Sequence, residues 1–387
     1  MYNHSFKSFI KNKLKEISKK NQFREITTTY RKRNNIVERE KNKLVSFSCN
    51  DYLSLSLNKK VIEAAKSATH KYGAGSGASR LITGNNPLYE KLESMLAKLK
   101  NAEACCVFGS GYLANLGVIS ALVSKKDIIF IDELSHSSTY LGAKLSNAKV
   151  IKFKHNDIVN LKKLIKTYRA KFQKCLIVTE GVFSMDGDIS PQDEISEITK
   201  DSNAMFLLDD AHGLGILGDG SGSNSIFKKK PSVDIYIGTL SKSLGSYGGF
   251  VCGNKTLIKF IVNRCRTQIY TTGLPPGVIG ATIKALEIIN KRKDLIKKPL
   301  ENAKYFCKLM NFDVPSSPIV PIILGEEKKV IKISNKLLAQ NFLVGAIRPP
   351  TVPEKSSRLR LAFNSSHTRI QIKKLSKVLK EAMFGKL

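Results

Sequence analysis

The sequence contains no tryptophan, comparatively few acidic residues and no long hydrophobic run. It has 32 Asp and Glu residues against 64 Lys and Arg residues, which gives a formal net charge of +32. No apolar run reaches the ~18 residues that a membrane-spanning helix needs. The N-terminal segment MYNHSFKSFIKNKLKEISKK lacks the apolar core of a secretory signal. We therefore expect a cytoplasmic protein with no membrane partner.

No two of the cysteines have the CxxC spacing. The seven lie at irregular intervals, at positions 49, 105, 106, 175, 252, 265 and 307. An odd number at irregular spacing predicts neither a disulfide framework nor a zinc site. We expect free, mostly buried thiols in a reducing compartment, and no bound metal.

The excess of basic residues leaves a nucleic-acid-binding protein open as an alternative, because positive surfaces attract nucleic acid through counterion release. The densest basic segments are Lys11–Lys20, Lys228–Lys230 and Lys291–Lys298, and none has interleaved aromatic residues. No nucleic-acid-binding motif accompanies them. We interpret most of the excess charge as solvated surface and expect no nucleic-acid partner.

A lysine surrounded by small residues follows a predicted strand. Val233, Ile235 and Ile237 alternate with polar residues, which predicts a strand. The chain then continues as GTLSKSLGSYGG, in which Lys242 is the one long amine. An amine given this space is typical of a nucleophile, although a solvated loop lysine explains this segment alone equally well.

Two other predicted strands also end in polar groups. MFLLDDAHGLG ends its apolar run at Asp209 and reaches His212, and LIVTEGVFSMDGD runs into Glu180 and Ser184. Open α/β sheets bind ligands at the carboxyl ends of their strands. Pyridoxal phosphate requires such a set, since a lysine holds its aldehyde and an acid keeps its pyridine nitrogen protonated.

The motifs TEGVFSMDGD, DDAHG and GTLSK, in this order, resemble the α-oxoamine synthase family of pyridoxal-phosphate enzymes. The resemblance runs from about the first helix to the C-terminus. It implies an α/β fold of type I, with a large domain (46–285) built on a mostly parallel seven-stranded sheet. A smaller C-terminal α+β domain (286–387) and an N-terminal helix and arm (1–45) complete the expected chain. The family also implies a homodimer with shared active sites.

The resemblance assigns cofactor-binding roles along the chain. Lys242 would bond to the aldehyde, Asp209 would face the pyridinium, and His212 would contact the phenolic oxygen. The start of a helix at Ser110 suits an anion, although an ordinary strand-to-helix turn remains an alternative. The full set of expected cofactor residues is Gly111, Tyr112, Ser184, Asp209, His212, Thr239, Lys242 and Thr272, the last of which would reach the phosphate of the partner subunit.

Five residues are expected at the substrate by the same resemblance: Arg24, Asn50, His136, Thr351 and Arg360. His136 would stack on the cofactor ring beside the substrate and, with Lys242 and Asp209, make up the catalytic set. Arg360 would bind the substrate carboxylate, unless it is a salt-bridged strand arginine. Asn50 is equally well explained as an Asx-turn residue, and Arg24 as a surface arginine.

The string RPPTVP, residues 348–353, favours one branch of the family. This branch condenses L-alanine with a pimeloyl thioester in biotin biosynthesis, and releases CO2 and the free carrier. Relatives that use glycine usually carry tyrosine-proline there, and they remain the alternative. Whether the carrier is coenzyme A or an acyl carrier protein stays open. Either thioester is anionic, and the positive charge of this chain would steer it to the site.

Overall fold

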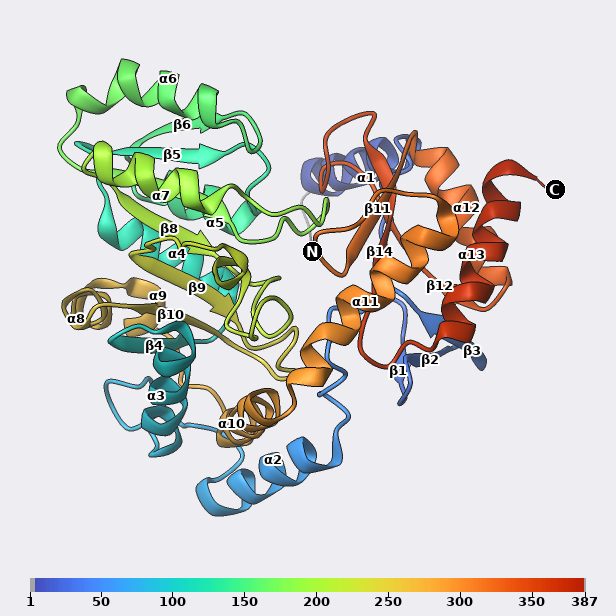
Figure 1. The fold of residues 1–387 in the computed structure, drawn as a ribbon, viewed down its shortest axis with the longest axis horizontal. Coiled ribbons are helices and arrows are strands. Elements are labelled where there is room, and N and C mark those ends of the chain that lie inside the picture. Colours follow the sequence, from blue (N-terminus) through green and yellow to red (C-terminus); the bar gives the residue numbers. More distant parts are fainter. Residues whose placement is uncertain (1–3, 386–387) are drawn as a thin grey trace.

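The computed structural model describes residues 4–385, and its larger part is built on a seven-stranded sheet (Figure 1). Strand β10 is antiparallel to both of its neighbours, and all other adjacent pairs are parallel. The mostly parallel seven-stranded sheet is therefore confirmed. Its order is β4 (Ala104–Phe108), β10 (Gly249–Gly253), β9 (Ile235–Thr239), β8 (Met205–Asp209), β7 (Cys175–Glu180), β5 (Ile128–Asp132) and β6 (Lys149–Phe153).

Helices cover both faces of this sheet, which explains why all residues of β5, β7 and β9 are buried. One face packs against α3 (Leu88–Lys100), α6 (Ile158–Tyr168), α7 (Gln192–Asp201) and α10 (Pro276–Lys291). The other packs against α4 (Gly111–Leu122), α5 (Ser137–Leu145) and α8 (Lys255–Arg264). Helix α2 (Lys59–Tyr72) lies along α10, and the short α9 (Arg266–Ile269) lies beside α4.

Local signals set the ends of several of these helices. Pro87 precedes α3, as its sequence predicts. The Asp157 side chain accepts a hydrogen bond from the backbone N–H of Asn160 and caps α6, which is shorter than the basic helix expected over residues 155–174. The strand predicted from Val233 begins at Ile235 instead and continues to Thr239.

The C-terminal part contains a second core. An antiparallel sheet of order β11 (Ile319–Gly325), β14 (Ser357–Ala362) and β13 (Gly345–Ile347) packs against α11 (Lys293–Met310), α12 (Glu327–Ala339) and α13 (Arg369–Phe384). Phe47, from the N-terminal side of the chain, is fully buried in this core. The N-terminal side of the chain therefore contributes a side chain to the core of the C-terminal part.

The N-terminal arm forms a four-stranded sheet with the C-terminal part. Its order is β1 (Tyr30–Arg31), β2 (Ile36–Arg39), β3 (Asn42–Ser46) and β12 (Phe342–Leu343), with β12 parallel to β3. The expected boundary after residue 45 falls within β3, and the one after 285 falls within α10, so the division into three parts stays a prediction. The expected N-terminal helix is α1 (His4–Lys19), whose apolar side chains are exposed.

All seven cysteines are free, and only Cys49 among them is not buried. Within residues 4–385 no helix combines the length and apolarity that crossing a bilayer requires. The described residues also contain no cluster of three or more side chains that could hold a metal ion.

Candidate active site

The carboxyl edge of the large sheet brings the predicted polar groups together. Glu180, Asp209 and Thr239 are the last residues of the adjacent strands β7, β8 and β9, and Glu180 is directly paired with Asp209 in the register. Lys242 lies in the turn that follows β9. Because neighbouring parallel strands end at one edge, two carboxylates, a hydroxyl and an amine share one site.

Lys242 is a lysine with unusual electrostatics. Burial is the largest influence, and although the carboxylates of Asp209 and Glu180 oppose it, the pKa of Lys242 is lowered to about 8. The positive charge of Arg360 lowers it further. An amine with this pKa is partly neutral near physiological pH and can act as a nucleophile. The solvated loop lysine that the sequence left open does not describe this environment.

Asp209 is buried and held by two donors. The Nδ2 atom of Asn115 donates to its Oδ2 atom at 2.6 Å, and the backbone N–H of Ala211 donates to Oδ1 at 3.1 Å. Asn115 also donates to Ser138 at 3.1 Å. Asn115 was not predicted from the sequence, because α4 is apolar on all sides and only its packing on the sheet brings the Asn115 amide to Asp209.

His212 is fixed by a tyrosine. The hydroxyl of Tyr52 lies 2.7 Å from His212 Nδ1, and both side chains are buried. Burial, reinforced by the positive charges of Lys242 and Arg360, holds the pKa of His212 well below its ordinary value, so the ring is neutral. Tyr52 lies two residues after Asn50 and was not predicted as a site residue.

His136 lies at the N-cap of α5, with Nδ1 at 2.7 Å from Ser138 Oγ. Its ring meets the Tyr112 ring edge-on, with centroids 6.5 Å apart. Burial lowers the pKa of His136, an effect opposed by Asp209 and reinforced by Lys242, so this imidazole is also neutral. A flat neutral ring at this place can stack on a heteroaromatic ring without adding charge.

Glu180 was expected at the end of a strand but was not predicted to have a role in the site. Its carboxylate accepts a hydrogen bond from the backbone N–H of His136. Burial, together with the negative charge of Asp209, raises the pKa of Glu180 well above its ordinary value. The carboxyl group of Glu180 therefore holds its proton more tightly than an ordinary glutamate does.

A cavity of about 790 Å³ opens over these groups. Seven of the predicted site residues line it: Asn50, His136, Ser184, His212, Lys242, Thr351 and Arg360. They come from the N-terminal arm, the large sheet and the C-terminal sheet, so the cavity lies between the two cores. Its volume suits a cofactor and a small substrate.

Arg360 has one free end in this cavity. Its Nε donates to the carbonyl oxygen of Ser184 at 2.5 Å and its Nη1 to Asn50 Oδ1 at 3.1 Å, while the buried Nη2 has no partner among residues 4–385. Arg358, two residues earlier, is the one that pairs with Asp186. Arg358, and not Arg360, is thus the salt-bridged arginine of this strand. Asn50 bonds to Arg360 instead of forming an Asx-turn.

Arg24 and Thr351 are brought together at the cavity wall. The Nη2 atom of Arg24 lies 3.5 Å from Thr351 Oγ1 and 3.5 Å from the carbonyl oxygen of Pro349. Arg348 donates to the carbonyl oxygen of Asn21 at 2.7 Å, which ties the same two segments together. Arg24 itself is exposed and does not line the cavity, so its role at the substrate stays a prediction.

Gly111 and Thr239 form a cradle at the start of α4. A Cβ atom at position 111 would lie 3.5 Å from the Thr239 Cβ, and one at Gly249 would come within 2.4 Å of the Gly111 backbone nitrogen. The contact at position 111 is an ordinary one, whereas only glycine at position 249 allows the helix start to lie this close to β10. The backbone N–H groups there, with the Thr239 hydroxyl, can hold a phosphate.

Thr272 is the one expected cofactor residue that this chain places elsewhere. It forms an isolated bridge with Ser79 and lines a separate, very small cavity beside Tyr89. Its expected role concerned the partner subunit, so its position within one chain leaves that role a prediction. The other groups fit pyridoxal phosphate: an amine of lowered pKa, a buried carboxylate held by two hydrogen-bond donors, and a phosphate cradle.

Comparison with known proteins agrees with this site. The family described as Aminotransferase class I and II matches residues 42–379. The 8-amino-7-oxononanoate synthase of Beijerinckia indica is 44% identical over 383 residues, which cover 99% of each chain.

Two solved structures have the same fold. Serine palmitoyltransferase from S. paucimobilis, solved with a bound pyridoxal phosphate–myriocin adduct, has a TM-score of 0.88 at 27% identity, covering 99% of this chain and 98% of its own. The 8-amino-7-oxononanoate synthase of Francisella tularensis has a TM-score of 0.74 at 30% identity, covering 87% of this chain and 97% of its own.

These similarities extend over nearly the whole chain, including the segment that contains Lys242. Pyridoxal phosphate is accordingly the cofactor. The chain is an enzyme and not the non-catalytic nucleic-acid-binding protein that its charge left open. It belongs to the class I and II aminotransferase family and, within it, to the 8-amino-7-oxononanoate synthases, pyridoxal-phosphate-dependent acyltransferases of biotin biosynthesis.

Proposed function

We propose that this enzyme condenses L-alanine with a pimeloyl thioester. The alanine Cα forms a bond to the thioester carbonyl carbon, the alanine carboxylate leaves as CO2, and the C–S bond breaks to release the thiol carrier. The nine-carbon product is 8-amino-7-oxononanoate. The observation that carries the proposal is the unpartnered Nη2 of Arg360, a buried guanidinium donor in the same cavity as Lys242.

Arg360 is suited to the alanine carboxylate. A buried donor without a partner is costly, and a carboxylate satisfies it with a charge-assisted hydrogen bond. Asn50 and the carbonyl oxygen of Ser184 fix the guanidinium plane. The alanine carboxylate is thereby held at one end of the cavity, and the alanine amino group is directed toward Lys242.

Lys242 and Asp209 divide the acid–base work. When bound, pyridoxal phosphate supplies an electron sink for the carbanion formed at the alanine Cα. Asp209 would face the ring nitrogen and keep it protonated, with Asn115 keeping Asp209 in place. Lys242 would hold the cofactor by its aldehyde, and its amine, with a pKa of about 8, would take the proton from the alanine Cα.

The acyl group would lie toward the proline-rich turn. Thr351 lines the cavity and Arg24 lies beside it, so a cation and a hydroxyl stand at the far wall. A pimeloyl chain ends in a carboxylate that suits these groups, whereas an acetyl group would not reach them. The glycine-using sister reaction is the alternative that this wall disfavours.

The enzyme is proposed to act as a homodimer in which the two subunits share their active sites. Thr272 does not line the cavity of its own chain, and its expected role is to contact the phosphate bound by the partner subunit. Whether coenzyme A or an acyl carrier protein carries the pimeloyl group is a choice between two anionic donors. Both would be attracted by the positive surface of this chain.

The decisive assay compares L-alanine with glycine, each with pimeloyl-coenzyme A and acetyl-coenzyme A. We expect turnover with L-alanine and pimeloyl-coenzyme A, and turnover preferring glycine and acetyl-coenzyme A would refute the proposal. Lys242→Ala should remain folded but lose turnover.

Arg360→Lys tests the carboxylate contact. It should raise the KM for alanine about 10- to 100-fold through loss of a charge-assisted hydrogen bond. Arg358→Lys, on the same strand, is the matched control and should leave the KM for alanine unchanged.

A further inference from the structure

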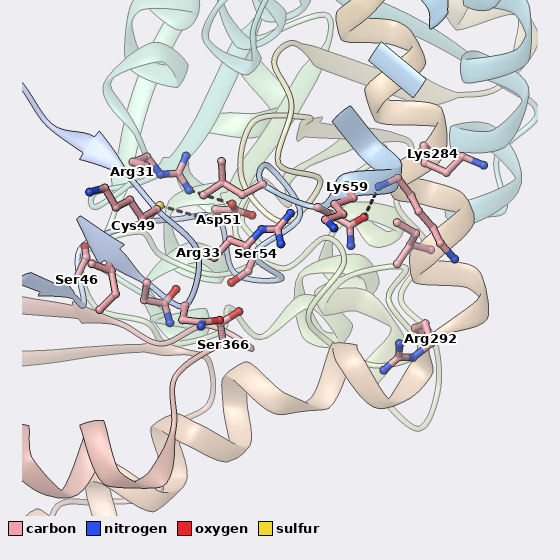
Figure 2. A pocket seen from close by; sticks show the side chains of 18 of the residues that line it. Arg31, Arg33, Ser46, Cys49, Asp51, Ser54, Lys59, Lys284, Arg292 and Ser366 are labelled. Carbon is pink, nitrogen blue, oxygen red and sulfur yellow. Dashed lines mark hydrogen bonds and ion pairs between the residues drawn. The ribbon is translucent and has the colours of Figure 1, made fainter. Parts of the chain in front are cut away.

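A second large cleft, of about 650 Å³, lies outside the active site and shares no lining residue with it. Figure 2 shows it between the N-terminal arm and helix α10, with Arg31, Arg33 and Asp51 on one side and Lys284 and Arg292 on the other. Ser366 closes it from the C-terminal part. The cleft thus lies where the two cores meet.

Positive charge dominates the lining of this cleft. Eight of its residues are cationic: Arg31, Lys32, Arg33, Lys59, Lys60, Lys284, Lys291 and Arg292. Only Asp51 and Glu287 are acidic, and each already forms an ion pair. No ion pair is formed among the described residues by four of the cations, namely Arg33, Lys59, Lys60 and Lys291. Converging like charges are unfavourable in the absence of an anion.

Two buried donors in the lining also lack partners. The hydroxyl of Ser54 and the Nδ2 atom of Asn35 are inaccessible to solvent and form no hydrogen bond. Ser54 has a φ of 54°, a left-handed conformation that costs a non-glycine residue free energy. Unsatisfied donors and backbone strain at one place are typical of a site that binds a ligand.

The chain connecting the cleft to the active site is short. Cys49 and Asp51 line the cleft, whereas Asn50 bonds to Arg360 and Tyr52 bonds to His212. Asp51 is held by Arg31 at 3.0 Å and by the backbone N–H of Leu55 at 2.9 Å. An anion that competes for Arg31 would alter the hold on Asp51, and so the position of its two neighbours.

We propose that this cleft binds a small molecule carrying a diphosphate, and that the bound anion acts on the active site through residues 49–52. A single carboxylate would neutralise too few of the four unpaired cations. A diphosphate supplies several charges and acceptor oxygens within a volume typical of small-molecule sites. The diphosphate could belong to a free nucleotide or to the coenzyme A part of an acyl donor.

The experiment titrates inorganic pyrophosphate into the holoenzyme by calorimetry. The variant Arg33→Ala/Lys60→Ala should weaken binding at least about tenfold, because it removes two unpaired cations from the cleft. The matched control Lys228→Ala/Lys229→Ala removes the same charge from an exposed loop and should bind like the parent protein. Unchanged cofactor absorbance establishes that both variants are folded and loaded.

Pyrophosphate should also change the KM for alanine at least twofold in the parent enzyme but not in the Arg33→Ala/Lys60→Ala variant. Displacement of pyrophosphate by coenzyme A would identify the acyl donor as the source of the diphosphate, and failure to displace it would identify a free effector. Absence of saturable binding, or equal loss in both double variants, would overturn the site. An unaltered KM would overturn the connection to the active site.

Discussion

The lowered pKa of Lys242 can be changed by one substitution. Burial alone would lower it further, and Asp209 is the largest of the influences that raise it again. Asp209→Asn removes the charge and retains the shape. An opposite charge within about 4–6 Å moves a pKa by ~1–3 units. Glu180 will ionise more readily once Asp209 is neutral, which offsets part of the loss. We therefore expect the pKa of Lys242 to fall by about 1 unit, from about 8 toward about 7.

The assay uses apoprotein, so that the amine is free. Acetylation of Lys242 is followed by mass spectrometry of its peptide across a pH series, because only the neutral amine reacts. The midpoint should shift to lower pH in Asp209→Asn. Glu133→Gln is the matched control, since Glu133 lines the same cavity but does not contribute to the shifted pKa of Lys242. An unchanged or higher midpoint in Asp209→Asn would refute the electrostatic account of this site.

Two further predictions concern buried charges. Lys100 donates to Asp210 at 2.9 Å, and both side chains are 1% exposed. Lys100→Met leaves the Asp210 carboxylate buried without its partner, so it should lower the free energy of unfolding by about 3–5 kcal/mol in urea titrations. Lys100→Met/Asp210→Asn should recover part of this loss. Burial lowers the pKa of His155, but hydrogen bonds with Asp132 and Asp188 outweigh it and raise the pKa to about 10. The free energy from this pairing is fully present below pH 6.5 and is lost as the pH rises toward about 10. The melting temperature should therefore fall more across that pH range in the parent protein than in His155→Gln.

Sequence patterns predicted the parts of the site that follow from strand ends. An apolar run that stops at a carboxylate or an imidazole places that group at a sheet edge, and this logic located Asp209, His212 and Lys242. The structure brings them to one edge and adds Arg360 from a different sheet. The individual roles of these residues remain proposals that the assays above address.

Contacts between distant segments were beyond prediction because no local pattern encodes them. Tyr52 reaches His212 across 160 positions, and β3 pairs with β12 across about 300. Asn115 looks like an ordinary helix residue until the helix is packed on the sheet, where its amide meets Asp209. These supporting residues depend on tertiary packing, whereas the groups they hold depend on strand periodicity.

The place where positive charge concentrates also could not be predicted from the sequence. Reading along the sequence identified its densest basic segments, and interpreted them as solvated surface. The cleft of Figure 2 is lined by cations from residues 31–33, 59–60 and 284–292, and only the last of these ranges overlaps one of the dense basic segments, Lys291–Lys298. Their convergence comes from the packing of α2 against α10 and of the arm against both cores. Electrostatic free energy depends on distances in space, so a chain with evenly spread lysines can still concentrate charge at one site. The net charge of +32 therefore has a local component, which the two double variants distinguish from general surface charge.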